Sequence, residues 1–492
     1  MFSDGDTGLE QPFAVLFEDS LRRLDQVRRE LGELEETYSR SVEYRGHRAF
    51  IEALQIVAYG LRQRILQHKQ SFLDKEDPAH RRSTYISLGT NAVAIGEHLE
   101  IHLSDLAAQR PQELEVFTVP FTRLAKSVID NVEILFVPWA FDGYEARAFG
   151  PEQFELLDID ADNLRQTFGS DILFLKLLHP ATRERDIFHH AVFAHELGHA
   201  AIQQPIPWKH LRHEDRPPEG EDPSTYETIG FDFLDRPEGI QRDREQQLLL
   251  WFRELACDVF AMRLIGPAFA IAFTEVTSPN RTLEPVERSQ AEHPPPHIRF
   301  RFLEEEVDNF FPEDSAERQL LCAYTKTYQS FASEQEEEIE GAEEWLGKAL
   351  GKFRAYLPHL LGDAEYKPEV LETDLDLVCV LAQREIPPAE RILPVEAAYS
   401  PGPDDEWSAP IDWRSILNGV LIWHCKQTGS PALERSPAPR ASGSDGDNRR
   451  RDFVRLAAGG IELSEFHTRA STLRRQYDHM RLDSELGRRV AQ

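Results

Sequence analysis

The stretch that most constrains the fold is His195-Glu196-Leu197-Gly198-His199, which joins two imidazoles and a carboxylate in the pattern H-E-x-x-H. Residues on a helix advance by about 100° each, so positions 195, 196 and 199 share one face. Two histidines at this spacing can bind one Zn²⁺, and the carboxylate between them can take a proton from the metal's water. The neighbouring apolar residues predict that this helix is buried: Ile187, Ala191, Ala194 and Ala201.

The five-residue pattern also occurs by chance on surface helices, and that interpretation stays open on the motif alone. The apolar flanks argue against it, because unpaired buried polar groups cost a few kcal/mol. Gly198 adds a second constraint, since glycine inside a helix costs about 1 kcal/mol against alanine. We expect so small a residue where another backbone or a substrate passes close to the helix.

A catalytic zinc site takes three protein ligands and keeps one position open. Candidates for the third ligand lie in residues 251–265, an apolar stretch that Gly266-Pro267 should end as a helix. Glu254 and Asp258 are four residues apart there and share a face. Buried charges are paired or metal-bound, so we predict Glu254 as the third ligand. Asp258 is then expected to accept a hydrogen bond from a ligand imidazole and fix its tautomer.

Two alternatives to this assignment remain at the level of sequence. Both acids could form salt bridges with Arg253 or Arg263 instead of serving a metal. Cys257 could be a ligand in place of Glu254. We expect Cys257 to be a small buried hydrophobe, because it lies off the Glu254 face and buried cysteines usually have that role.

A third element, residues 293–299, reads His-Pro-Pro-Pro-His-Ile-Arg and is expected to be a stiff extended turn rather than a helix. In this order, the three elements resemble the gluzincin metallopeptidases, in particular the HtpX-like and CAAX-prenyl endopeptidase group. The resemblance covers roughly residues 170 to 305. That group carries transmembrane helices beside its active site and this chain has no such stretch, so the substrate class does not carry over.

The resemblance implies a zincin-type core with a small sheet, and a zinc endopeptidase activity. It implies His195, His199 and Glu254 as zinc ligands and Glu196 as the general base. It also implies that His293 lies near the metal and stabilises the oxyanion, and that Arg299 supports the turn.

Other possible oxyanion donors are Tyr144 and Tyr226, and sequence cannot choose among them. His189 and His190 precede the motif, and we expect a capping or core role for them rather than metal binding.

Residues 171–180 and 132–137 are predicted strands. Zincins place an edge strand before the first metal helix, where backbone pairing can bind an extended peptide. We expect 171–180 to be that edge strand, and an interior strand is the alternative.

The composition limits the partners of this protein. Among 492 residues, Lys plus Arg number 55 and Asp plus Glu 86, so the net charge is 55 − 86 = −31. Nucleic-acid binding needs a basic surface, and anionic membranes also attract basic segments, so both are disfavoured. The four cysteines contain no C-x-x-C pair. With no signal-peptide pattern and no long apolar run, we expect a soluble, cytoplasmic protein.

We expect an α+β chain whose metallopeptidase core is embedded in helical flanks. The predicted regions are an N-terminal helical region (1–80), a mixed helical connector (81–130), the core (131–310), a helical C-terminal domain (311–435), a flexible linker (436–452) and a C-terminal helix (453–492). The N-terminal helices are expected to pack on the core, and an oligomerisation or docking arm is the alternative. Residues 204–242 could form a lid, an activation segment or a disordered insertion. Strand-like and helical pieces are expected around 375–381 and 413–423.

The function favoured by these patterns is a soluble zinc endopeptidase acting on peptides or proteins. Two alternatives keep the zinc site: a sensor or regulator that acts by binding a partner, and a latent protease that a partner activates. Such partners, or a homo-oligomer, would use the helical flanks. An aminopeptidase would need an acidic cluster for the substrate amine, and no clear motif for one is present.

Overall fold

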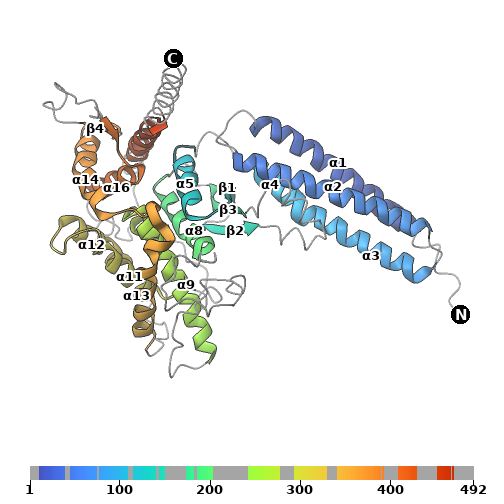
Figure 1. Ribbon diagram of the computed structural model, residues 1–492, viewed down its shortest axis with the longest axis horizontal. Helices are drawn as coiled ribbons and strands as arrows, with labels where there is room; N and C mark the ends of the chain where they lie inside the picture. Colours follow the sequence, from blue (N-terminus) through green and yellow to red (C-terminus); the bar gives the residue numbers. More distant parts are fainter. Residues whose placement is uncertain are drawn as a thin grey trace, which may run out of the picture. The chain divides into compact units, whose positions relative to one another are not determined.

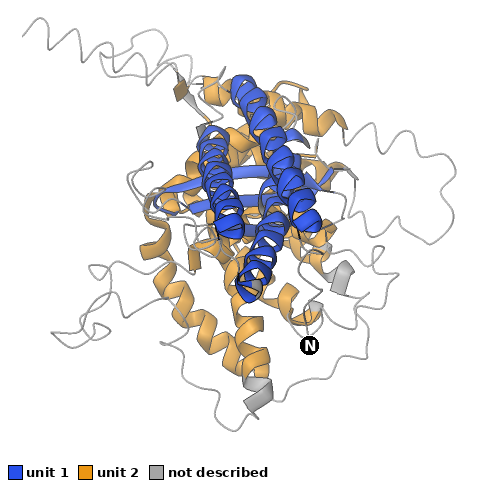
Figure 2. Cartoon of the chain, turned by 90° about the vertical axis from the view of Figure 1, so that its right-hand side faces the viewer, with its two compact units in different colours: residues 1–113, 129–182 blue, residues 114–128, 183–492 orange. Residues whose placement is uncertain are grey.

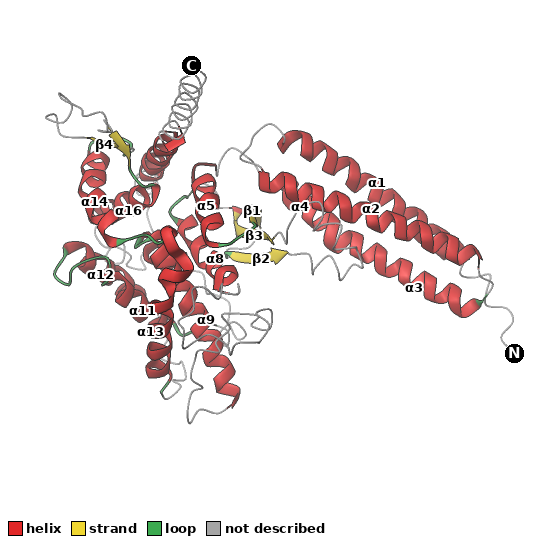
Figure 3. Ribbon diagram, viewed as in Figure 1, coloured by secondary structure: helices red, strands yellow, loops and turns green. Residues whose placement is uncertain are grey.

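The computed structural model describes residues 10–38, 45–74, 77–108, 115–139, 143–149, 173–181, 186–202, 242–276, 293–329, 341–388, 390–392, 408–428, 451–466 and 468–469. The chain divides into two compact units, residues 1–113 with 129–182 (unit 1) and residues 114–128 with 183–492 (unit 2), coloured in Figure 2. Helices dominate both units and a small sheet lies in unit 1 (Figure 3), so the expected α+β class is confirmed. The zincin-type arrangement stays a prediction.

Unit 1 begins with a bundle of long helices (Figure 1). Their bounds are α1 (Glu10–Tyr38), α2 (Arg45–Asp74), α3 (Pro78–Ala94), the π-helix η3 (Ile95–Glu100) and α4 (Ile101–Ala108). Apolar side chains recur every three or four residues along α1, and so line one face of the helix. The buried ones include Phe13, Phe17, Leu24, Val27 and Leu31. They join the α2 side chains and part of the sheet in one apolar core.

The sheet of unit 1 has three strands, β1 (Val132–Trp139), β2 (Glu145–Phe149) and β3 (Leu173–Pro180), in the order β1-β3-β2. β1 pairs with β3 in parallel, and β2 pairs with β3 antiparallel. Both predicted strands are therefore confirmed. The prediction that 171–180 is an edge strand is wrong, because β3 has a paired strand on each side. Its nearly continuous burial, one residue of eight being only partly covered, is typical of such an interior strand.

Unit 2 is built from helices joined by short connections where the structure describes them. The elements are α5 (Glu115–Val128), η5 (His189–Val192), α8 (Phe193–Ile202), α9 (Arg242–Ile265), α10 (Ala268–Val276), α11 (Pro296–Val307), α12 (Ala316–Gln329), α13 (Ala342–Leu361), η11 (Gly362–Ala364), α14 (Pro368–Gln383), β4 (Glu390–Ile392), β5 (Ser408–Pro410) and α16 (Trp413–Thr428). Residues 451–466 are also helical. The H-E-x-x-H motif lies on α8, as predicted.

The predicted stop at Gly266-Pro267 is confirmed, because α9 ends at Ile265. Gly266 has φ 95°, in the left-handed region that glycine tolerates best. Asn418 of α16 holds the junction. Its Nδ2 donates to the carbonyl of Ile265 at 2.7 Å, and its Oδ1 accepts from the Ala268 amide at 2.5 Å.

Two local predictions need correction. Residues 375–381 are helical, because they lie inside α14, whose buried residues Leu371, Leu375 and Val378 recur at helical spacing. Residues 293–299 are only partly an extended turn, since α11 begins at Pro296. Proline is well tolerated at the first helical position, where its missing N–H has no helical partner.

The predicted domain limits remain a prediction, although the compact units group the strands with the N-terminal helices rather than with α8 and α9. The insertion at 204–242 lies outside the described residues almost entirely, and so does nearly all of the linker at 436–452. Within the described ranges, no helix is long and apolar enough to cross a membrane.

Candidate metal centre

The centre is built where α8 crosses α9 inside unit 2. His195 and Glu196 of α8 are buried, with 4% and 8% of their surfaces exposed. The small residue expected at Gly198 is explained by the neighbouring helix. A β-carbon at Gly198 would lie 3.2 Å from both Cα and Cβ of Cys257, and 3.2 Å from Cδ1 of Phe260. The α9 backbone therefore passes close to α8 at the level of the motif.

Three candidate ligand residues converge at this crossing. Nε2 of His195 lies 3.1 Å from Nε2 of His199. The two carboxylate oxygens of Glu254 lie 3.4 Å from these nitrogens, one from each. Ligand atoms held 2.0–2.1 Å from a tetrahedral zinc are separated by about 3.3 Å. The donor set and its spacing therefore suit Zn²⁺. Among the described residues, this trio forms the group able to hold a metal ion.

The second ring nitrogen of His195 faces a carboxylate. Nδ1 lies 2.8 Å from Oδ1 of Asp258, one helical turn after Glu254 on α9. An Nδ1–H that donates to Asp258 leaves the Nε2 lone pair directed at the metal position. The four-residue spacing of the two acids predicts this contact. The structure brings both acids to the H-E-x-x-H helix, one to each side of the His195 ring.

Arg299 of α11 closes the buried side of the centre. Its Nε and Nη2 donate to the two Asp258 oxygens at 2.5 and 2.8 Å, and Nη2 also lies 3.5 Å from Glu254. The guanidinium lies over the Phe273 ring, 4.1 Å from its centroid. Arg299 was expected to support the proline turn. That support stays a prediction, and the structure adds a contact that sequence alone did not reveal, with the guanidinium as the counter-ion of Asp258.

His199 has a different partner from His195. Its Nδ1 lies 3.4 Å from Sγ of Cys257, which is fully buried. Cys257 was expected to be a plain core residue off the Glu254 face. It is buried as predicted, but its thiol contacts a candidate ligand. The signal was present in the sequence, because Glu254 and Cys257 are three residues apart and side chains at this spacing are neighbours on a helix.

The charges of the centre shift its protonation equilibria in opposite directions. Burial lowers the pKa of His195, but the hydrogen bond to Asp258 and its charge outweigh burial and raise that pKa to about 9. Burial and the charge of His195 lower the pKa of His199 to about 3. Burial raises the pKa of Glu254, and hydrogen bonds from His195 and His293 more than reverse this, so it stays ionised at neutral pH.

His293 lies at the solvent-facing side of the centre. Its Nδ1 is 2.9 Å from Oε2 of Glu254, and half of its side chain is exposed. The structure therefore brings His293 to the predicted ligand trio, while its role in oxyanion binding stays a prediction. Of the other two candidates, Tyr144 belongs to unit 1, and Tyr226 lies outside the described residues.

The remaining histidines before the motif have structural partners. His189 lies 2.8 Å from Glu275 and 3.3 Å from Asp186, and His190 is buried against the Phe193 ring with centroids 5.2 Å apart. This agrees with the expected capping or core role.

The alternative salt bridge from Asp258 or Glu254 to Arg263 is not formed. Arg263 instead pairs with Glu306 and Glu365.

Comparisons with protein-family models, curated proteins and solved structures found no match for this chain.

Proposed function

We propose that this protein is a zinc-dependent endopeptidase. The observation that carries the proposal is the convergence of His195, His199 and Glu254 at separations that suit one tetrahedral zinc. A bound zinc would supply Lewis acidity toward a water molecule and the scissile carbonyl. The donor set of two imidazoles and one carboxylate is also typical of catalytic zinc sites that keep an open position.

The protein's own groups would handle the protons. Glu196 lies between the two ligand histidines, and its carboxylate would take a proton from the attacking water and deliver it to the leaving amine. His293, at the solvent-facing side beside Glu254, would donate a hydrogen bond to the carbonyl oxygen as negative charge develops there. Asp258 and Arg299 would hold the His195 ring in one tautomer throughout.

The first experiment measures bound metal in the purified protein by elemental analysis, beside Glu254→Ala. We expect one zinc per chain in the wild type, and a loss or strong weakening in the variant. Iron in place of zinc would contradict the proposal, because two histidines and one carboxylate also bind Fe(II) in oxygenases. Absence of metal after reconstitution would also contradict it.

The second experiment tests the chemistry with Glu196→Gln, which keeps the size of the side chain and removes its basicity. We expect normal zinc content and a loss of cleavage of at least a hundredfold on a mixed peptide library, followed by mass spectrometry. The matched control is Glu372→Gln, an exposed glutamate of α14. Cleavage by Glu196→Gln at the wild-type rate would contradict the assigned base.

We also propose the reducing cytoplasm as the working location. The four cysteines lie within the described residues and none of them is joined in a disulfide there, as is typical of proteins of that compartment.

A further inference from the structure

Arg253 of α9 is a cation beside the metal centre that none of the contacts described above involves. It directly precedes Glu254 and lies four residues before Cys257, so its side chain neighbours Cys257 on the helix surface. The thiol of Cys257 contacts Nδ1 of His199 at 3.4 Å. The charge of Arg253 is also among the causes that lower the pKa of His199, after burial and the charge of His195. Arg253 therefore lies on the His199 side of the centre.

The His199 side is the more open side of the centre. The side chain of His199 is 21% exposed, against 6% for His195, which Asp258 and Arg299 enclose. Arg253 itself is partly exposed. A peptide that approaches His199 from the solvent would therefore pass close to the Arg253 guanidinium.

The guanidinium of Arg253 has no partner among the residues that the structure describes. Its Nε is buried without a hydrogen-bond partner, and no carboxylate of the described ranges forms an ion pair with it. The salt bridge to Glu254 or Asp258 that the sequence allowed is therefore not formed. Arg263, on the same helix, pairs with two carboxylates. Because buried charged groups are costly unless paired, Arg253 is suited to a partner from outside the chain.

The charges of the centre indicate which partner fits. The centre contains three carboxylates, those of Glu196, Glu254 and Asp258. Arg299 and the two charges of a bound zinc would balance them, so the charge of Arg253 is left over. An anion would balance it, and a carboxylate matches the planar guanidinium with two parallel hydrogen bonds. Carboxylates are also the anionic groups that an unmodified peptide supplies.

We propose that Arg253 binds a carboxylate of the peptide substrate and makes the centre selective for acidic peptides. The proposal rests on the proposed endopeptidase function, and it assigns Arg253 to the substrate rather than to the metal. Two sources supply such a carboxylate, an Asp or Glu side chain near the cleaved bond and the C-terminus of the peptide. Both present the same group to the guanidinium, and amidated peptides distinguish them.

The net charge of −31 acts against acidic peptides only at a distance. At physiological salt the field of exposed charges is screened over about 8 Å. The contact with Arg253 is made at hydrogen-bond distance beside buried groups, where salt screens much less. The local pair should therefore outweigh the surface charge at physiological salt.

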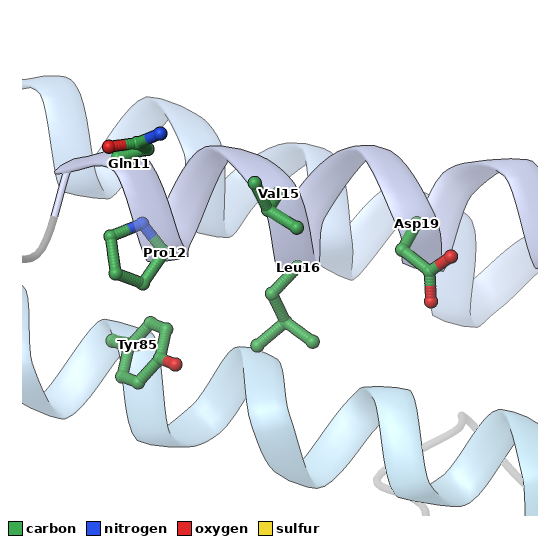
Figure 4. Close-up of a pocket in the computed structure, with 6 residues that line it drawn as sticks. All are labelled: Gln11, Pro12, Val15, Leu16, Asp19 and Tyr85. Atoms are coloured by element: carbon green, nitrogen blue, oxygen red, sulfur yellow. The ribbon is translucent and has the colours of Figure 1, made fainter.

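The shallow pocket of unit 1 offers no comparable partner for a carboxylate (Figure 4). It lies between α1 and α3, and no Lys or Arg is among the described residues that line it, which are Gln11, Pro12, Val15, Leu16, Asp19 and Tyr85. The charged side chain there is that of Asp19, an acid that pairs with Arg22. Of these two places, Arg253 is the one that can bind an acidic peptide.

The first test measures cleavage of a mixed peptide library by mass spectrometry, with the wild type beside Arg253→Glu. We expect Asp and Glu to be enriched near the bonds that the wild type cleaves. Lys and Arg should replace them in the variant, because the new carboxylate repels acids and pairs with bases. Arg384→Glu, an equal charge change at an exposed position of unit 2, is the control and should keep the wild-type preference.

The same library with amidated C-termini identifies the source of the carboxylate. Loss of cleavage on amidation would assign the peptide C-terminus to Arg253. Unchanged cleavage, with Asp and Glu still enriched, would assign the acidic side chain, which is the result that we expect for an endopeptidase.

Arg253→Gln gives the size of the effect on a single cleaved peptide. For the wild type, replacing the acid of the peptide by its amide should raise KM about tenfold to a hundredfold. The kcat should change little, because the contact lies away from the reacting atoms. Arg253→Gln should cleave the acid and the amide alike. Its zinc content should stay at one per chain and its melting temperature should not fall, because the substitution leaves no described group without a partner.

Retention of the library on immobilised Glu196→Gln separates this proposal from the endopeptidase proposal, because it requires no cleavage. Glu196→Gln should retain peptides rich in Asp and Glu, and the double variant with Arg253→Gln should lose this preference. If the wild type binds no zinc and cleaves nothing, the endopeptidase proposal fails, and the retained peptides still decide whether Arg253 binds carboxylates.

Two results would overturn the proposal. Cleavage or retention by the chain with native Arg253 that shows no preference for acids would mean that Arg253 binds no carboxylate. A marked fall in the melting temperature of Arg253→Gln, with the acid preference intact, would give Arg253 a structural role instead.

Discussion

At the scale of single residues, the centre depends on how Asp258 and Arg299 orient the His195 ring. Asp258 accepts from its Nδ1 and is itself bound by two nitrogens of Arg299. Asp258→Asn keeps the shape, removes the charge and leaves the Arg299 guanidinium without its buried counter-ion. Such outer partners contribute 10- to 100-fold to metal affinity. We therefore expect the zinc dissociation constant of Asp258→Asn to rise by about this factor.

The measurement is competition for zinc with a chromophoric chelator. The control is Glu372→Gln on α14, which also replaces a carboxylate by an amide. A dissociation constant unchanged in Asp258→Asn would mean that the carboxylate only neutralises Arg299 and does not orient the ligand.

The pKa of His195 gives a second prediction at this scale. In the metal-free protein it is about 9, whereas His199, at about 3, and Glu254 are already deprotonated at neutral pH. Zinc must therefore displace one proton, from His195. Its apparent affinity should rise about tenfold per pH unit from pH 6 to pH 8. Calorimetric titration in buffers of different ionisation enthalpy should detect the released proton. Release of no proton at pH 7 would contradict this assignment.

The raised pKa of His195 also affects the stability of the metal-free protein. The folded pKa of His195 is above its unfolded value of about 6.5, so the protonated ring stabilises the metal-free protein. This contribution is fully present below pH 6.5 and is lost as the pH rises through 9. We expect the metal-free protein to lose up to about 3 kcal/mol over this range, measured by urea unfolding at several pH values. The variant Asp258→Asn should show a weaker dependence.

How much of the centre was predictable differs from residue to residue. The spacing of His195, Glu196 and His199 along the sequence predicts that they share one face of a helix. The same argument places Glu254 and Asp258 on one face of the next helix. The contact between His199 and Cys257, and the place of Arg299 over Phe273, depend on how separate helices cross. That crossing is set by packing of whole faces, and no single stretch of sequence contains it.

At the scale of elements, the approach of α8 to α9 depends on Gly198. Alanine would favour the helix by about 1 kcal/mol, but its β-carbon would meet Cys257 and Phe260 at 3.2 Å. Overpacking of this kind typically costs 1–3 kcal/mol. We expect Gly198→Ala to lose about 0–2 kcal/mol of stability, and to bind zinc less tightly because Glu254 moves away with α9.

The matched control is Gly351→Ala on α13, where a β-carbon would meet no atom within 4 Å. That variant should be as stable as the wild type or more so, as measured by thermal unfolding. If Gly198→Ala gained stability as Gly351→Ala does, α8 and α9 would be less closely packed than described.

The helices and strands themselves were easier to predict than which of them lie side by side. The long helices of unit 1 and the strands β1 and β3 follow from the spacing of apolar residues. The central position of β3 does not follow from its sequence. A continuous apolar run is expected both for a strand covered by helices and for a strand flanked by other strands. The start of α11 was missed because three successive prolines suggest extended backbone, while the last of them also suits the first turn of a helix.

At the scale of the whole molecule, each of the two units buries its own apolar residues. A unit with its own core can unfold cooperatively by itself, so we expect two heat-absorption transitions in scanning calorimetry. The metal ligands all lie in unit 2, and zinc should therefore raise only one transition. A ligand at 100 times its dissociation constant stabilises by about 2.7 kcal/mol. The zinc-sensitive transition should lose this response in Glu254→Ala.

The other transition belongs to unit 1 and can be assigned by a core variant. Leu54 is fully buried among the bundle helices, and Leu54→Ala should cost about 2–5 kcal/mol there. It should lower the zinc-insensitive transition and leave the zinc-dependent shift of the other unchanged. A single transition moved by both zinc and Leu54→Ala would mean that the units unfold together. Metal binding at the α8–α9 crossing would then stabilise the helical bundle of unit 1 as well.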